Sequence, residues 1–113
     1  MNNKRRAEIS RIIKTIHMAK NEDDVEQASH LVGIAKDDTE SVRDDEQDCL
    51  NNMPENLENS EQYERMENAV DNLDDAIDSL DDAIDELDGD DGSIEAATPS
   101  LTDAIDSLDK ARE

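Results

Sequence analysis

Residues 66–87 read MENAVDNLDDAIDSLDDAIDEL, and this stretch decides the fold. Its larger apolar residues alternate at steps of four and three, which places them on one face of an α-helix. Alanine occupies a flanking position in each heptad, so the apolar face is three positions wide. Such a face favours a helical bundle over a narrow two-stranded coiled coil. The apolar positions are Met66, Val70, Leu73, Ile77, Leu80, Ile84 and Leu87.

The end of the chain repeats this unit. Leu73–Ala83 reads LDDAIDSLDDA and Leu101–Ala111 reads LTDAIDSLDKA, so nine of eleven positions are identical at an offset of 28 residues. Because this offset is a whole number of heptads, the register also permits one long, kinked helix. The intervening segment 89–99 contains two glycines and one proline, which are costly inside a helix. We therefore expect two helices joined as a hairpin.

Capping signals and prolines give the element boundaries of a single domain over residues 1–113. Asp23 or Asp24 is a suitable N-cap for a second helix. Pro54 disfavours helix immediately before it, and Thr98–Pro99 is typical of an N-cap followed by the first helical residue. The predicted elements are a basic helix over 3–20, a helix over 24–49, a loop over 51–59, an acidic helix over 60–88, a Gly/Asp-rich turn over 89–97 and a helix over 99–112.

The core that this chain can build is thin. The sequence contains no Phe or Trp and one Tyr, so its apolar volume comes from Ile, Leu, Val, Ala and Met. Small cores give marginal stability, and a partner chain would add buried surface. We therefore predict an all-α antiparallel helical bundle, or a coiled-coil-like hairpin, completed by formation of a homodimer. The predicted oligomer-interface residues are Met66, Val70, Leu73, Ile77, Leu80, Ile84, Leu87, Leu101, Ile105 and Leu108.

Charge is distributed unevenly along the sequence. Residues 1–20 carry a net charge of +5 and residues 21–113 a net charge of −27, which together give −22. Repulsion between like charges at this density opposes compaction, so the acidity needs an explanation. Adaptation to a high-salt environment is one candidate, solubility is another and a binding function is a third. The basic arm over residues 3–20 either neutralises acids of its own bundle or contacts those of a dimer mate.

The middle of the chain carries several short motifs. Glu40–Glu64 reads ESVRDDEQDCLNNMPENLENSEQYE and Glu67–Leu87 reads ENAVDNLDDAIDSLDDAIDEL, after a basic start at Asn3–Arg6. The D-E-Q segment, the N-x-P-E-N-L loop, the S-E-x-Y-E helix start and the L-x-x-A-I units resemble a group of short acidic proteins from bacteriophages and prophages. The likeness covers about two thirds of the chain, with segments 22–31 and 89–99 as insertions. This group has no established activity, so the resemblance implies a phage context and a helical fold but no catalytic residues.

The reactive side chains do not form a recognisable enzyme active site. The sequence has no phosphate-binding Gly loop, no Gly-x-Ser-x-Gly motif and no Cys/His cluster, and His17 and His30 lie apart. A catalytic carboxylate needs a pocket that shifts its pKa, and few residues are available to build one. The acidic turn over 88–92 does not fit a calcium-binding loop, because Thr98 occupies the position of the bidentate Glu. We predict no catalytic residue, no metal site and no cofactor.

Cysteine usage and hydropathy indicate an intracellular setting. Cys49 is the single cysteine, so no internal disulfide can form, as expected in a reducing compartment. No apolar run approaches the roughly 20 residues that span a bilayer. The basic N-terminus lacks the continuous apolar segment of a signal peptide. We therefore expect a protein of the host bacterial cytoplasm that binds neither membranes nor nucleic acid directly.

The outer positions of the acidic helix suggest what the chain binds. Residues 71–88 carry nine carboxylates over about 27 Å, which is one charge per ~3 Å. Two such helices side by side would approach the ~1.7 Å spacing of charges along duplex DNA. The alternative is that these are simply the solvated positions of an amphipathic helix. The predicted partner-binding residues are Asp71, Asp74, Asp75, Asp78, Asp81, Asp82, Asp85, Asp88, Asp103 and Asp106.

Two functions follow as hypotheses from these patterns. The first is a phage-encoded anti-defence inhibitor, an acidic DNA mimic that blocks the DNA-binding site of a host nuclease such as a CRISPR effector or a restriction enzyme. The second is a helical adaptor or structural phage protein that binds partner helices through its apolar stripe. A partner displaced by DNA supports the first hypothesis, and an apolar partner insensitive to salt supports the second.

Overall fold

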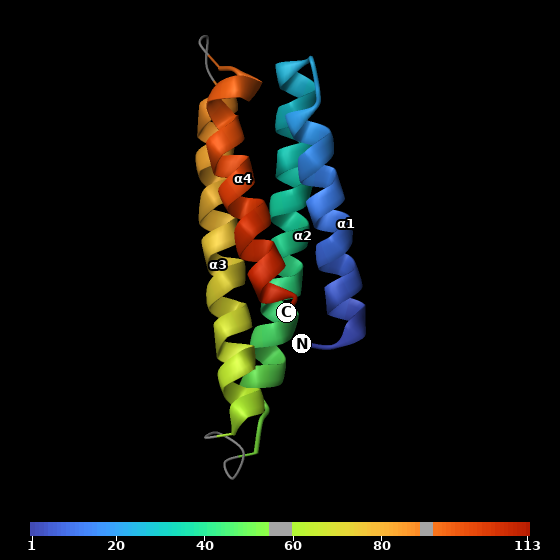
Figure 1. Cartoon of the computed structure of the whole chain (residues 1–113), viewed down its shortest axis with the longest axis vertical. Coiled ribbons are helices and arrows are strands. Elements are labelled where there is room, and N and C mark those ends of the chain that lie inside the picture. Colours follow the sequence, from blue (N-terminus) through green and yellow to red (C-terminus); the bar gives the residue numbers. More distant parts are fainter. Residues whose placement is uncertain (55–59, 89–91) are drawn as a thin grey trace.

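The computed structural model describes residues 1–54, 60–88 and 92–113, and these residues form four α-helices (Figure 1). The helices are α1 (Asn3–Lys20), α2 (Val25–Asn51), α3 (Glu61–Leu87) and α4 (Ile94–Ala111). They form an elongated bundle measuring 53 × 20 × 17 Å. The described residues contain no β-strand. The prediction of an all-α antiparallel helical bundle is confirmed.

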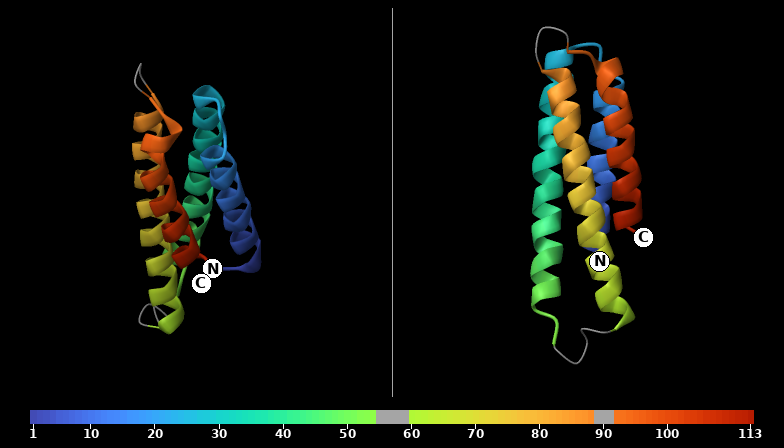
Figure 2. Two further views of the ribbon diagram at one scale, coloured as in Figure 1. Left: turned by 45° about the horizontal axis from the view of Figure 1, so that its top comes forward. Right: turned by 90° about the vertical axis from the view of Figure 1, so that its left-hand side faces the viewer.

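Each helix runs antiparallel to the preceding one and packs beside it (Figures 1 and 2). α4 also packs against α1 and closes the bundle, so α1 and α3 lie diagonally across it. α3 and α4 therefore form the predicted hairpin and not one kinked helix. At one end of the bundle, α2 and α3 extend past the start of α1 and the end of α4 (Figure 1).

The first three helices lie close to their predicted ranges. α1 spans residues 3–20 as predicted, and Asp24 caps α2 by accepting a hydrogen bond from the main-chain N–H of Glu26. α2 continues to Asn51, two residues beyond the predicted end at 49. Ser60 caps α3. Residues 55–59 of the predicted loop and residues 89–91 of the predicted turn lie outside the described residues.

The predicted start of the last helix is wrong. α4 begins at Ile94 because the Ser93 side chain accepts a hydrogen bond from the N–H of Ala96, at 3.0 Å. Pro99 is therefore the sixth helical residue and not the first. A proline there leaves the carbonyl of Glu95 without its helical N–H donor, but both residues are exposed, so water can solvate that carbonyl.

The apolar stripe forms the interior of one chain. Eight of the ten predicted oligomer-interface residues are buried, and Ile77 and Ile84 are half-buried. Isoleucines of α1 and valines of α2 cover the stripe from the opposite side. A second copy is therefore not needed to bury these residues, and the homodimer stays a prediction that rests on the thinness of the core. The eight buried residues are Met66, Val70, Leu73, Leu80, Leu87, Leu101, Ile105 and Leu108.

Alanines bring α3 and α4 close together. Each helix contributes three buried alanines at heptad spacing, none more than 5% exposed. Small side chains at the flank of an apolar face let two helix backbones approach, and the remaining core side chains then pack around them at high density. The alanines are Ala69, Ala76 and Ala83 in α3 and Ala97, Ala104 and Ala111 in α4.

We expect Gly33→Ala to stabilise the fold. Gly33 lies inside α2, and a Cβ at this position would meet no atom within 4 Å. Alanine is favoured over glycine inside a helix by about 1 kcal/mol, so the thermal midpoint should rise by several degrees. Circular dichroism during heating measures this change. An unchanged or lower midpoint would mean that a methyl group at position 33 disturbs the packing around α2.

Candidate partner-binding surface

An outer acidic ridge runs along α3. It consists of seven exposed carboxylates at steps of three and four, on the side of the helix opposite the apolar stripe. The ridge is about 32 Å long, with one charge per ~5 Å, which is less dense than one DNA strand at ~3.4 Å. No ion pair joins these side chains to a cation within the described residues. The ridge residues are Glu64, Glu67, Asp71, Asp75, Asp78, Asp82 and Asp85.

Two of the predicted partner-binding residues form ion pairs between α3 and α2. Asp74 Oδ1 lies 3.3 Å from Arg43 Nη1, and Asp81 Oδ1 lies 2.5 Å from Lys36 Nζ. Both carboxylates are therefore balanced by cations of α2. The predicted residues Asp74, Asp78, Asp81 and Asp85 are thus divided, and only Asp78 and Asp85 belong to the ridge.

The contact between Lys36 and Asp81 shifts the pKa of the lysine. The hydrogen bond that Lys36 donates to Asp81 raises its pKa, and partial desolvation opposes the rise. A raised lysine pKa gives stability that is present below the ordinary value of 10.5 and lost as pH rises through the folded-state value. This contact is therefore insensitive to pH near neutrality.

The predicted pair of acidic helices side by side does not form. α4 lies beside α3, but the polar residues that line the hollow between them, of about 460 Å³, are mixed in charge: Arg65, Lys110, Asn68, Asn72, Asp71 and Glu113. Asp103 and Asp106 are exposed on α4, yet they do not extend the ridge into a second row of comparable density. Asp88 is exposed as the C-cap of α3. Of these two helices, only α3 therefore carries a dense row of exposed carboxylates.

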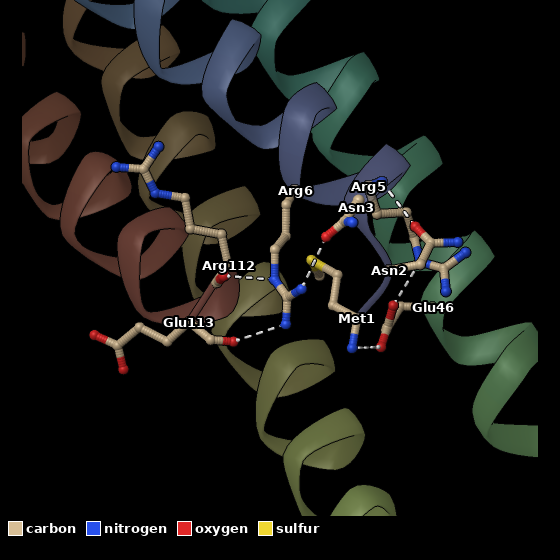
Figure 3. A network of polar contacts seen from close by, with 8 residues as sticks. All are labelled: Met1, Asn2, Asn3, Arg5, Arg6, Glu46, Arg112 and Glu113. Carbon is tan, nitrogen blue, oxygen red and sulfur yellow. Dashed lines mark hydrogen bonds and ion pairs between the residues drawn. The ribbon is translucent and has the colours of Figure 1, made fainter.

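The basic helix α1 does not neutralise the ridge, because it lies diagonally opposite α3. Its exposed cations are Lys4, Arg11 and Lys14, and none forms an ion pair within the described residues. Arg6 instead donates to the main-chain oxygen of Arg112, at 3.0 Å. The basic arm therefore contains two kinds of cation. Lys4, Arg11 and Lys14 project outward, whereas Arg6 joins the start of α1 to the end of α4 (Figure 3).

A buried carboxylate anchors α1 to α2. Glu46 is fully buried; its Oε2 accepts a hydrogen bond from Arg5 Nε at 2.6 Å, and its Oε1 lies 3.5 Å from the ammonium group of Met1 (Figure 3). The sequence prediction missed this site. Glu46 continues the buried positions Thr39 and Val42 at steps of three and four, so an acid on the apolar stripe was the available signal.

Two other kinds of site, namely a membrane-spanning helix and a metal-binding cluster of His, Cys, Asp or Glu side chains, are absent from the described parts of the chain. No helix among residues 1–54, 60–88 and 92–113 has the length and apolar character to cross a membrane. Nor do those residues contain a group of three or more His, Cys, Asp or Glu side chains placed to hold a metal. Comparisons with protein-family models, curated proteins and solved structures find no match.

We expect salt to stabilise the fold. Residues 21–113 carry a net charge of −27, and their mutual repulsion is screened as the Debye length falls from about 30 Å at 0.01 M to 8 Å at 0.15 M salt. The attraction between Arg5 and Glu46 is short and buried, so it is screened much less. The thermal midpoint should therefore rise across this range. A midpoint that falls would mean that attraction between α1 and the acidic helices dominates.

Proposed function

We propose that this protein is a phage-encoded anti-defence inhibitor that acts in the cytoplasm of a host bacterium. Its outer acidic ridge occupies the DNA-binding site of a host nuclease, such as a CRISPR effector or a restriction enzyme. The observation that carries this proposal is the ridge itself. Seven exposed carboxylates on one rigid helix have no cation partner within the described residues.

The ridge fits a basic surface by charge and by regularity. Successive ridge residues are separated by ~4.5–6 Å along the helix axis, a scale on which a row of Lys and Arg side chains that hold phosphates can pair with them. Ordinary amphipathic helices mix lysine with glutamate on the outer face, whereas α3 has no Lys or Arg after Arg65. The outer face of α3 therefore presents one sign of charge over most of its length.

The test compares two variants with the same net charge. The ridge variant changes Asp75, Asp78, Asp82 and Asp85 to Asn. Each exposed ion pair is worth about 0–1 kcal/mol, so four together should weaken binding by about 2 kcal/mol, or roughly 30-fold. The nuclease is captured from host lysate on the immobilised protein and eluted with duplex DNA. Its affinity for wild type and variants is then measured.

The control variant changes Asp37, Asp38, Asp45 and Asp48 of α2 to Asn. These four residues are also exposed and outside the ion pairs of the described structure, so the variant raises the net charge by the same amount. It should retain nearly wild-type affinity. Equal losses in both variants would mean that only total charge matters, and failure of duplex DNA to displace the nuclease would exclude DNA mimicry.

A helical adaptor remains the second candidate, but it has lost the surface on which it was based. The apolar stripe is buried within the bundle, so a partner helix could reach it only if the bundle opened. Large exposed apolar residues in the described parts of the chain are restricted to Met18 and Ile34. A homodimer likewise remains a prediction, tested by light scattering at micromolar concentration.

A further inference from the structure

Sulfur atoms gather at one end of the bundle. The chain has five sulfur-containing residues, four Met and one Cys. Four of them line a single cavity of about 290 Å³, where α2 and α3 extend past the start of α1. They are Met1, Cys49, Met53 and Met66. Only Met18 lies elsewhere, and it is 59% exposed.

Three of these residues form the minimal set of donors. Cys49 and Met53 are half-buried near the end of α2, and Met66 is 6% exposed in the second turn of α3. The thioether of Met1 is directed toward Arg6 (Figure 3). Met1 therefore lines the cavity but is not a required ligand. Methionine side chains are unbranched and flexible, and Met53 and Met66 line the same cavity as Cys49.

We propose that this cavity is a binding site for Cu(I), with Cys49, Met53 and Met66 as ligands. Thiolate and thioether sulfurs are soft donors that select Cu(I) over hard cations such as Mg²⁺ and Ca²⁺. Binding converts the Cys49 thiol to a thiolate, and its proton passes to solvent. The positive charges nearest the cavity are on Arg5 and the Met1 ammonium, and the buried Glu46 that contacts both offsets one of the two. The net charge of −22 further raises the local concentration of cations.

The experiment measures transfer of Cu(I) from its coloured complex with bicinchoninate, under ascorbate, to the full chain. Wild type should withdraw one equivalent. Cys49→Ser should abolish transfer, and Met53→Leu and Met66→Leu should each weaken binding by about tenfold or more, the scale on which even outer partners of a metal act. Met18→Leu is the matched control and should change nothing. Since Met to Leu conserves volume, helicity measured by circular dichroism should remain at the wild-type value.

The methionine variants separate this site from binding by an isolated thiol. If Cys49→Ser abolishes transfer but both Met53→Leu and Met66→Leu bind like wild type, the thiol acts alone and the proposal is wrong. Failure of wild type to withdraw Cu(I), or equal weakening by Met18→Leu, also overturns it. Should a variant unfold, ¹³C-methyl methionine spectra of wild type with Ag(I) decide the question. The proposal requires shifts of the Met53 and Met66 methyl signals with that of Met18 unchanged.

Discussion

Replacing Glu46 with Gln should lower the free energy of unfolding by about 3–5 kcal/mol, the cost of breaking a buried ion pair by removing one partner. The substitution keeps the shape of the side chain but leaves Arg5 and the Met1 ammonium without their buried counter-charge. For a domain of this size the thermal midpoint should fall by roughly 10 °C or more. Urea unfolding followed by circular dichroism gives the free energy directly.

The matched control is the same substitution at Glu40, on the same helix. Glu40 lies 3.9 Å from Lys36, and its side chain is 42% exposed, so Glu40→Gln should cost no more than about 1 kcal/mol. If the two variants lose the same stability, the pairing of Glu46 with α1 contributes little, and α1 is held mainly by its isoleucines.

Replacing Leu80 with Ala should lower the free energy of unfolding by about 2–5 kcal/mol. Leu80 is fully buried in α3, and truncation removes apolar contacts and leaves a cavity. Ile34→Ala is the control, because Ile34 is 39% exposed on α2 and should cost much less. Denaturant unfolding of both variants measures the difference.

The dependence of the unfolding midpoint on protein concentration tests whether the folded unit is one chain or a dimer. A stripe buried within one chain gives an unfolding midpoint that is independent of protein concentration, whereas an obligate dimer gives a midpoint that rises with it. We expect the midpoint of the wild type and of Leu80→Ala to stay constant from micromolar to submillimolar concentration. A rising midpoint would show that the predicted homodimer is the folded unit.

Periodicity predicted the helices and their buried faces because both are local properties of the sequence. The spacing of Leu73, Leu80, Leu101 and Leu108 defines an apolar face, and the structure buries all four. The start of α4 could not be assigned as easily, since two capping signals compete there. Ser93 outcompetes Thr98 because the exposed Pro99 is tolerated one turn inside the helix.

The division of the acidic side chains could not be predicted in the same way. Asp74 and Asp78 look equivalent in the sequence, but they differ by about a tenth of a turn around the helix, and that difference decides which one meets Arg43. Which flank of α3 faces α2 depends on how the helices are arranged around the bundle. The burial of Glu46 also depends on how the helices are arranged, because its counter-charges come from the distant start of the chain.

The diagonal placement of α1 and α3 gives the molecule an electric dipole across its short axis. Cations project from one side and the acidic ridge from the other, so the field of a basic cleft would exert a torque on the approaching protein. The bundle would rotate about its length until α3 leads, and fewer collisions would be wasted on unproductive orientations. Such steering acts on the association rate before any contact forms, and it weakens as ionic strength rises.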